Sequence, residues 1–404
     1  MKQERRFLVY WLGQTLSGFG DAFALVALPL LVLEATGSVT GMGMVSAAGI
    51  AAQVVTSLFS GTLIDRVDRR KTMLVCDLGR AVAYGFLPLL GWLGHRPLWV
   101  IYLTVIMGGA LSNVFSVGYM TSVPALVGQD QLHGANAKLQ GSLALAYVLG
   151  SLSAGVLTAA LGPLGAIAID GGTFLISAVS LWLIQFDGYQ RQAGGKHERF
   201  GAGWRFLMGH RLLRPMTLLL VLLGIFGNMG VGAGITDLMI FHVKRELALD
   251  AFRVGACIGI TALGALLGAV AAPSLSRRLG SGQCFLSGNF VQAAGLIIIG
   301  LVPHMAAVAA GGLLWGAGMM MRGVPMHSLR QSLIPSELLG RVTALSWTAI
   351  FGGSAIGTAI MTRIAAHTSA GSTMLGIGVA VLLLATVAWF GPIRERSRVR
   401  SPPD

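Results

Sequence analysis

The chain has 404 residues, a net charge of +13, a hydrophobic fraction of 54%, only 11% charged residues and a mean hydropathy of +0.73. Soluble globular domains carry roughly 25% charged residues, so this composition excludes them, together with the soluble nucleic-acid-binding proteins that so basic a chain would otherwise suggest. It indicates a membrane protein whose basic residues face anionic lipid headgroups, without nucleic acid as a partner.

Apolar stretches follow one another along the chain, separated by short polar breaks. A helix of about 20 apolar residues crosses a hydrocarbon core of about 30 Å, and the stretches lack the alternation typical of a membrane β-barrel. The sequence therefore predicts an all-α, polytopic membrane protein with twelve transmembrane helices. Their predicted spans are 7–34, 39–64, 73–94, 97–121, 138–161, 164–186, 213–240, 252–274, 283–302, 304–328, 343–365 and 371–391.

The distribution of basic residues predicts how the helices are oriented. If the N-terminus is cytoplasmic, 22 of the 29 lysines and arginines lie in cytoplasmic segments and only four lie in outer loops. Lys and Arg are retained on the cytoplasmic side of a membrane, so we expect both termini to be cytoplasmic. The first helix has no small-residue cleavage site, and we interpret it as retained rather than as a signal peptide.

A long polar stretch divides the helices six and six. It predicts an N-terminal six-helix bundle at 1–186, a cytoplasmic linker at 187–212 and a C-terminal six-helix bundle at 213–404. Two pairs of segments are similar between the halves: 63–68 resembles 275–280, and 126–130 resembles 333–337. Because each pair follows the same helix of its half, duplication explains the similarity, and the two bundles are expected to be pseudo-symmetric.

The loop between the second and third helices carries the most specific motif. Gly61, Leu63, Asp65, Arg66, Arg69, Arg70 and Lys71 match G-x-L-x-D-R-x-G-R-[RK], with Asp68 in place of the central glycine. This pattern resembles the major facilitator superfamily. Within it the chain is most similar to the bacterial macrolide and siderophore exporters, through Gly20-Asp21, Ala135-Asn136, Ala168-Ile169-Asp170 and Gly340-Arg341-Val342.

The resemblance implies a role for the loop motif in gating. In similar proteins the carboxylate equivalent to Asp65 lies against the N-terminus of helix 11 and pairs with arginines, which latches the two halves on the cytoplasmic side. A positive helix end stabilises a carboxylate by up to about 2 kcal/mol, an energy suited to a latch that must open. The predicted cytoplasmic gate consists of Gly61, Asp65, Arg66, Arg69, Arg70 and Lys71, of which the basic residues also serve as a topology signal.

Asp21 is the leading candidate for coupling or substrate contact. It lies near the middle of the first helix, where a charge is costly unless it faces a cavity or a partner. A carboxyl that takes up and releases a proton there would serve a proton-driven antiporter, whereas a hydrogen bond to a neighbouring helix is the structural alternative. The full set of candidates for proton coupling or substrate contact is Asp21, Asp170, Arg322, Asn113, Asn228 and Trp315.

The other candidates have structural alternatives as well. Arg322 and Trp315 lie among methionines of helix 10 and could hold a large, variable ligand, but methionine and aromatic residues are also common packing residues. Asn113 and Asn228 could bind substrate or bond neighbouring helices. Asp77 and Arg80, three residues apart near the cytoplasmic end of helix 3, are predicted to be a structural charge pair.

Catalytic and nucleotide motifs are absent from the sequence. It has no phosphate loop, no H-E-x-x-H or G-x-S-x-G motif, and only three cysteines without metal-ligand spacing, so we expect no enzyme, no cofactor and no metal site. Gly141, Gly150 and Gly155 match the antiporter motif of drug exporters only in part. Thr104 stands nearest to the position of the helix-4 arginine of many proton-coupled relatives.

Together these features predict a secondary active transporter in the bacterial inner membrane, acting as a monomer. The resemblance implies an alternating-access exporter of an amphiphilic small molecule such as a drug, a macrolide or a siderophore, with protons as the expected coupling ion. The alternatives are an importer or lysolipid transporter of the same fold, or a ligand sensor that moves no substrate.

Overall fold

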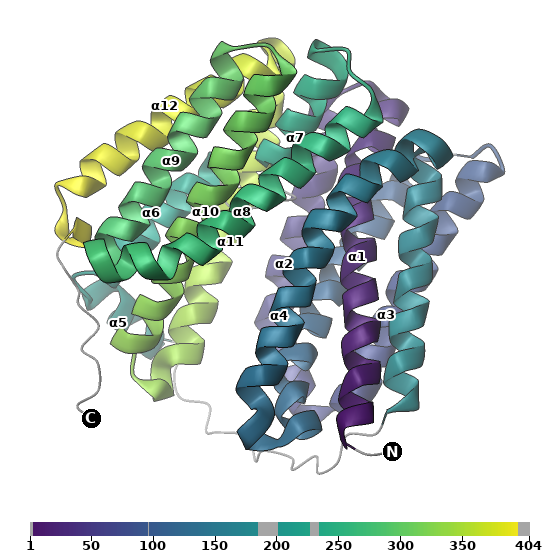
Figure 1. The fold of residues 1–404 in the computed structure, drawn as a ribbon, viewed down its shortest axis with the longest axis horizontal. Coiled ribbons are helices and arrows are strands. Elements are labelled where there is room, and N and C mark those ends of the chain that lie inside the picture. Colours follow the sequence, from purple (N-terminus) through teal and green to yellow (C-terminus); the bar gives the residue numbers. More distant parts are fainter. Residues whose placement is uncertain (1–2, 96, 185–200, 227–233, 395–404) are drawn as a thin grey trace. The chain divides into compact units, whose positions relative to one another are not determined.

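The computed structural model describes residues 3–95, 97–184, 201–226 and 234–394 (Figure 1). All regular structure within these ranges is helical, which confirms the predicted all-α fold. The N-terminal helices are α1 (Gln3–Thr36), α2 (Val39–Arg66), α3 (Arg69–Trp92) and α4 (Leu98–Leu183). The first three agree with the predicted spans to within a few residues at each end.

Helix α4 joins three predicted spans, because the polar breaks between them are helical as well. A straight helix of its 86 residues would be about 130 Å long, several times the thickness of a membrane core. Instead α4 turns back on itself: Gly162 has a φ of +72°, a conformation that favours glycine, at the predicted break between helices 5 and 6. As a result α1, α2 and α3 all pack against α4.

The remaining long helices follow the predicted spans, and three short helices lie outside those spans. They are α5 (Gly201–Gly209), α6 (Leu213–Ile225), α7 (Gly234–Phe241), the π-helix η1 (His242–Glu246), α8 (Ala251–Leu279), α9 (Ser281–Leu301), α10 (Met305–Leu333), α11 (Ser336–His367), α12 (Ala370–Trp389) and the 3-10 helix η2 (Pro392–Arg394). The predicted linker thus contains a helix, α5; the predicted seventh span contains α6 and α7, and η1 follows it.

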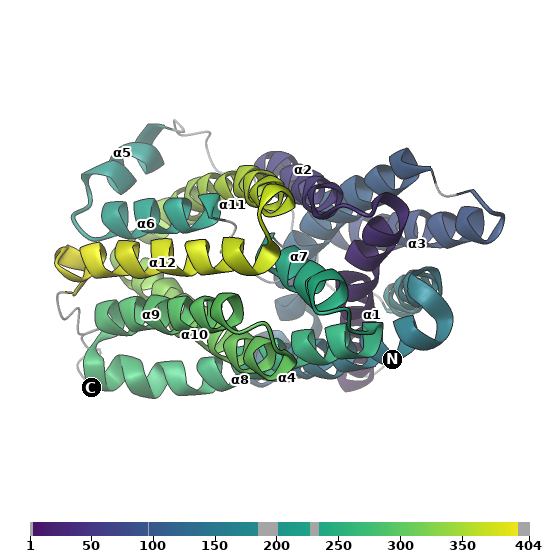
Figure 2. The same ribbon diagram turned by 90° about the horizontal axis from the view of Figure 1, so that it is seen from above.

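Packing divides the chain into two compact units. Unit 1 comprises residues 1–196 and 250–259, and unit 2 comprises residues 197–249 and 260–404. In unit 2, α9 packs against both α10 and α12, and Figure 2 shows α9 and α12 running side by side. Each unit has its own buried apolar interior, with Tyr10, Met73 and Leu126 in unit 1 and Phe285, Trp315 and Met374 in unit 2.

Nine helices of the described residues are long and apolar enough to span a membrane. Three features separate this number from the predicted twelve: residues 138–183 hold two predicted spans in one helix, the predicted seventh span includes residues 227–233, which lie outside the described residues, and the Gly-rich α10 is not among the nine. The helices are therefore consistent with twelve crossings of the membrane.

Glycines bring the helices of unit 2 into direct backbone contact. A Cβ atom on Gly264 would lie 2.1 Å from the carbonyl oxygen of Leu313, and one on Gly268 would lie 2.2 Å from that of Ala317. Gly295 of α9 and Gly311 of α10 meet in the same way. In lipid, where helices gain nothing from the hydrophobic effect by associating, such close contact stabilises helix pairs.

Candidate functional site

Four ionisable side chains of unit 1 lie together within the helical bundle. They are Asp21 of α1, Asp77 and Arg80 of α3, and Asp170 of α4, and we refer to them as the charge cluster. Asp21 and Arg80 each lie about halfway along their helices. The cluster is therefore far from both helix ends, where a charge needs a compensating partner.

Arg80 is the centre of the cluster. Its guanidinium donates to the carboxylate of Asp77 in a close ion pair, and its Nη1 lies 3.9 Å from Oδ1 of Asp21. The rings of Phe115 and Phe174 lie 4.6 Å and 4.2 Å from its Cζ, so the cation also gains from two aromatic faces. These contacts hold a fully charged side chain that is only 3% exposed.

Asp77 connects three segments of unit 1. Its second carboxylate oxygen accepts a 2.6 Å hydrogen bond from the hydroxyl of Ser177, and that hydroxyl accepts a 2.9 Å bond from the side-chain amide of Gln14. Because these residues come from α1, α3 and the last part of α4, the network links all three. Hydrogen bonds of this kind are required when a carboxylate is buried.

Asp170 is buried and has fewer partners. Its Oδ1 accepts a 3.3 Å hydrogen bond from Thr173, and it interacts electrostatically with Arg80, but its Oδ2 has no hydrogen-bond partner among the described residues. A Cβ atom on Gly20 would lie 2.5 Å from Oδ1 of Asp170. Only glycine at position 20 lets α1 approach this carboxyl so closely.

Asp21 differs from the rest of the cluster in being accessible. Its side chain is 54% exposed, whereas those of Asp77 and Arg80 are buried. The 3.9 Å distance to Arg80 is too long for a hydrogen bond, so the two groups interact only electrostatically. The cluster thus combines one exposed carboxyl with a buried ion pair and a second buried carboxyl.

From the sequence, these four residues were not predicted to lie together. Asp21 and Asp170 were predicted as coupling candidates and Asp77 and Arg80 as a local structural pair; the structure joins all four through Arg80. Gln14, Thr173 and Ser177 were not predicted. The signal for the last two is the spacing of Asp170, Thr173 and Ser177 by three and four residues, which places polar groups on one helix face.

The other predicted candidates lie elsewhere. Asn113 is half-buried in α4, and its Oδ1 has no hydrogen-bond partner among the described residues. Arg322 and Trp315 are buried in α10, within unit 2. Asn228 lies outside the described residues.

The predicted gate motif spans the end of α2 and the start of α3. Gly61, Asp65 and Arg66 belong to α2, but their side chains lie outside the described part, and Arg69 begins α3. Asp68, which replaces the glycine of the motif, is the N-cap of α3, and its carboxylate accepts hydrogen bonds from the backbone N–H groups of Arg70 (2.9 Å) and Lys71 (3.2 Å). The departure from the motif therefore has a local structural role.

Arg70, predicted to mark the cytoplasmic side of the membrane, also forms hydrogen bonds within unit 1. Its Nε donates a 2.8 Å hydrogen bond to the carbonyl of Leu181, and its Nη2 donates to the carbonyl of Trp182. These carbonyls belong to the last turn of α4, where a cation satisfies unpaired acceptors and complements the helix dipole. Arg70 thus ties the start of α3 to the end of α4.

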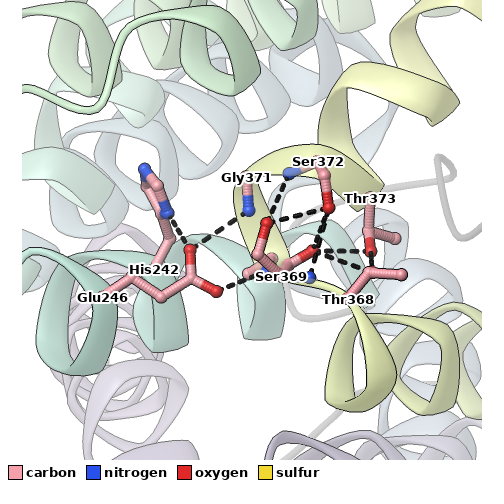
Figure 3. A network of polar contacts seen from close by, with 8 residues as sticks. His242, Glu246, Thr368, Ser369, Gly371, Ser372 and Thr373 are labelled. Atoms are coloured by element: carbon pink, nitrogen blue, oxygen red, sulfur yellow. Dashed lines mark hydrogen bonds and ion pairs between the residues drawn. The ribbon is translucent and has the colours of Figure 1, made fainter.

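A second polar network lies in unit 2, at the start of α12 (Figure 3). Glu246 of η1 accepts hydrogen bonds from the backbone N–H groups of Ala370 and Gly371, which begin α12, and its carboxylate also pairs with His242 one turn earlier. Burial raises the pKa of Glu246, but its hydrogen bonds to His242, Ala370 and Gly371 outweigh this effect and hold the pKa below its ordinary value. A carboxylate thus stabilises the N-terminus of α12.

Ser369 completes the cap of the same helix. Its hydroxyl accepts a 2.9 Å hydrogen bond from the N–H of Ser372, and the Ser372 hydroxyl accepts one from the N–H of Ser369. This reciprocal capping box satisfies two further donors of α12. The network visible in Figure 3 is therefore a structural junction between η1 and α12.

Comparison with known proteins identifies the family. Residues 10–358 match the Major Facilitator Superfamily, which covers most of the chain. The chain belongs to the Major Facilitator Superfamily. It is accordingly a multi-pass membrane transporter, as the loop motif at Gly61–Lys71 predicted.

Relatives in the superfamily include exporters. The chain is 24% identical to the multidrug efflux pump Tap of Mycolicibacterium fortuitum over 96% of both chains. It is 25% identical to the enterobactin exporter EntS of Escherichia coli O1:K1, over 89% of this chain and 86% of that protein. These relatives confirm the predicted resemblance to the exporter branch.

Solved structures of superfamily transporters share the fold. The nucleoside transporter NupG superposes with a TM-score of 0.76 at 12% identity, covering 96% of this chain and 98% of that one. A bacterial homologue of the iron transporter ferroportin, in an inward-facing state, superposes with a TM-score of 0.73 at 20% identity, covering 98% and 100%. In the described part of this chain, no three His, Cys, Asp or Glu residues are arranged to hold a metal ion.

Proposed function

We propose that this transporter exports an amphiphilic small molecule from the bacterial cytoplasm across the inner membrane in exchange for protons. The relatives named for multidrug efflux and for enterobactin export support the direction and the substrate class. The observation that carries the proton coupling is the accessible carboxyl of Asp21 beside the buried Arg80. In this proposal both termini are cytoplasmic and the transporter works as a monomer.

Charge balance is the physical basis of the coupling. With all three carboxyls ionised, a single guanidinium would leave the cluster with a surplus of negative charge inside the bundle, which is costly in a medium of low dielectric constant. Proton binding removes part of that surplus. Because Asp77 already has Arg80 and Ser177 as partners, we assign proton exchange to Asp21, which can reach water, and a supporting role to Asp170.

Arg80 would couple the protonation of one carboxyl to its interactions with the others. When Asp21 is ionised it attracts the guanidinium, and when it is neutral Arg80 interacts more strongly with Asp77 and Asp170. The rings of Phe115 and Phe174 limit the movement of the guanidinium to a small shift. Such a shift would alter how α1 packs against α3 and α4, and these helices would change position during alternating access.

Substrate contacts are proposed for the polar candidates outside the cluster. Asn113 offers a carbonyl oxygen without a hydrogen-bond partner in the described part of the chain, and we propose that it accepts a bond from the substrate. Arg322, Trp315 and Asn228 are proposed as contacts contributed by unit 2. Because Arg322 and Trp315 are buried, their contact with substrate would require a different conformation of α10.

The test of coupling is Asp21→Asn in proteoliposomes loaded with a dye-like cation and exposed to a pH gradient. We expect the variant to insert and fold but to lose proton-linked flux and the dependence of transport on the pH gradient. Glu34→Gln, which removes an acidic residue near the end of the same helix, is the matched control and should transport normally. Unchanged transport and pH dependence in Asp21→Asn would exclude Asp21 from the mechanism.

The same assay distinguishes other functions of the fold. Uptake that follows the proton gradient inward would assign import instead of export, and tight binding without flux would assign a sensor. Comparing macrolide susceptibility and siderophore secretion between a strain that lacks the chain and its parent would then identify the substrate class.

We also propose that the motif Gly61–Lys71 forms the cytoplasmic gate, with Asp65 as its latch. Asp65→Asn should slow the transport cycle without weakening ligand binding, because a latch acts on conformational exchange rather than on the binding site. Turnover and binding affinity measured on the same preparation test this separation. Equal turnover in the variant and the parent would refute the latch.

A further inference from the structure

Helix α5 is set apart from the transmembrane helices by a sharp bend. Residues Gly203–Gly209 make an angle of 98° with Leu213–Ile225 of α6. If α6 crosses the membrane, α5 runs nearly parallel to the membrane surface. Figure 2 places α5 at the edge of unit 2, beside α6.

Contacts of His210 stabilise the bend between α5 and α6. Nδ1 of His210 accepts hydrogen bonds of 3.2 Å from the backbone N–H groups of Leu212, the N-cap of α6, and Leu213, its first residue. Its ring also lies 5.7 Å from that of Phe206. Burial lowers the pKa of His210, which favours the neutral ring that these bonds require.

One face of α5 packs against unit 2. Leu207 is buried in an apolar cluster with Leu213, Ile334 and Val342, which come from the starts of α6 and α11 and the residue after α10. Phe206 and Met208 pack against the same cluster. This face holds α5 in place against the ends of three transmembrane helices.

The other face of α5 is exposed and carries an aromatic ring and positive charge. Trp204 is 52% exposed, and Arg205 beside it is exposed as well. Arg211 and Arg214, which flank the start of α6, are also exposed. Indole rings are enriched at membrane interfaces, and arginines there bind lipid phosphates.

We propose that α5 is an interfacial helix that binds anionic phospholipid headgroups. Trp204 would lie at the level of the headgroups, and Arg205, Arg211 and Arg214 would contact their phosphates. A helix that buries one apolar face, exposes Trp204 and Arg205 on the other and lies at right angles to a transmembrane helix matches the geometry of helices that lie in the interface. Arginine is too costly in hydrocarbon for α5 to be a re-entrant part of the membrane span.

The first experiment counts bound lipid by native mass spectrometry. The purified full chain is titrated with phosphatidylglycerol and with phosphatidylcholine. Arg211→Gln/Arg214→Gln should bind phosphatidylglycerol about 25-fold more weakly than the parent, at about fivefold per arginine, with phosphatidylcholine binding unchanged. The matched control, Arg245→Gln/Arg253→Gln, removes two exposed arginines elsewhere and should change the affinity by less than twofold.

Two outcomes would overturn the proposal. An equal loss of affinity in both double variants would show that only net charge matters and that α5 is no specific site. Displacement of phosphatidylglycerol by millimolar inorganic phosphate would assign the arginines to a free anion instead of a lipid headgroup.

A second measurement does not depend on the charged variants. The full chain is reconstituted in bilayers with lipids brominated near the headgroup end of their acyl chains, and its fluorescence is compared with that of Trp204→Phe. The fluorescence that the parent has and Trp204→Phe lacks is the emission of Trp204. The proposal predicts that the brominated lipids quench this emission in the parent. If that part is instead quenched by aqueous iodide and unaffected by brominated lipid, α5 does not lie in the interface.

Discussion

The polar networks of the two units lie at different places along their helices. In unit 1 the charge cluster lies halfway along the helices, where Arg80 is shared among Asp21, Asp77 and Asp170. In unit 2 the network around Glu246 lies at a helix terminus, and the neighbouring helices meet through glycine backbones. The difference teaches that a buried network halfway along the helices links several helices of one unit to each other, whereas a network at a helix terminus satisfies the backbone donors of that one helix.

Replacing Arg80 tests the cluster most severely. Arg80→Met removes its only cation and leaves the buried carboxyls without a counter-charge, which we expect to cost about 3–5 kcal/mol of stability. The unfolding midpoint of purified protein should fall by many degrees. The double variant Arg80→Met/Asp77→Asn should recover part of the loss because it also removes the stranded carboxylate; no loss in the single variant would show that the cluster is not electrostatically coupled.

Enlarging a glycine tests the packing of unit 2. Gly268→Ala places a Cβ against the carbonyl of Ala317, so α8 and α10 must separate, at a cost of about 1–3 kcal/mol. Gly376→Ala in α12 is the matched control, since no described atom outside its own stretch of helix lies within 4 Å of its Cβ position. Thermal unfolding of both variants measures the difference, and equal midpoints would contradict the close backbone contact.

Removing the charge at the end of α12 should have the smallest effect. Glu246→Gln weakens the bonds to Ala370, Gly371 and His242, and we expect a loss of about 1 kcal/mol. Because the folded protein holds the pKa of Glu246 below its ordinary value, the carboxylate stabilises the fold above the ordinary pKa of about 4.3. That contribution is lost as the pH falls further through the lowered pKa.

Unfolding midpoints of parent and Glu246→Gln between pH 7 and pH 3.5 measure this effect. The gap between the two proteins should be constant from pH 7 to about 5 and should narrow below about 4.3. A gap that widens on acidification would show that the carboxylate does not stabilise α12.

The positions of the helices could be predicted closely from the sequence, but the structure of the segments that connect them could not. The spans 39–64 and 283–302 correspond to α2 and α9 to within a few residues, because long apolar runs have one stable form in lipid. The polar breaks inside α4 were predicted as loops, yet they are helical. Hydropathy reports which residues avoid water, so it marked a break at Gly162, but it does not report whether the chain at a break stays helical.

The candidate site could be predicted only in part. Asp21 was predicted because a carboxyl in an apolar run is conspicuous, whereas Asp77 and Arg80 were predicted to pair only with each other. The meeting of Asp21 and Arg80 depends on how α1 packs against α3 and α4, and on Gly20, which allows Asp170 to approach. Contacts across such distances along the chain have no local signature.

The sequence alone determined that this is an all-helical membrane transporter of the major facilitator type, because apolar runs and a charged loop motif are local and the lipid leaves a backbone few alternatives. The tertiary structure alone decided which charges share a partner, that Asp68 and Arg70 secure helix ends, and that α5 turns at a right angle from α6. The shared charges and the bonds of Arg70 arise where segments distant in sequence meet, while the cap at Asp68 and the bend before α6 are local, and the energies of all of them depend on distance, burial and hydrogen-bond geometry.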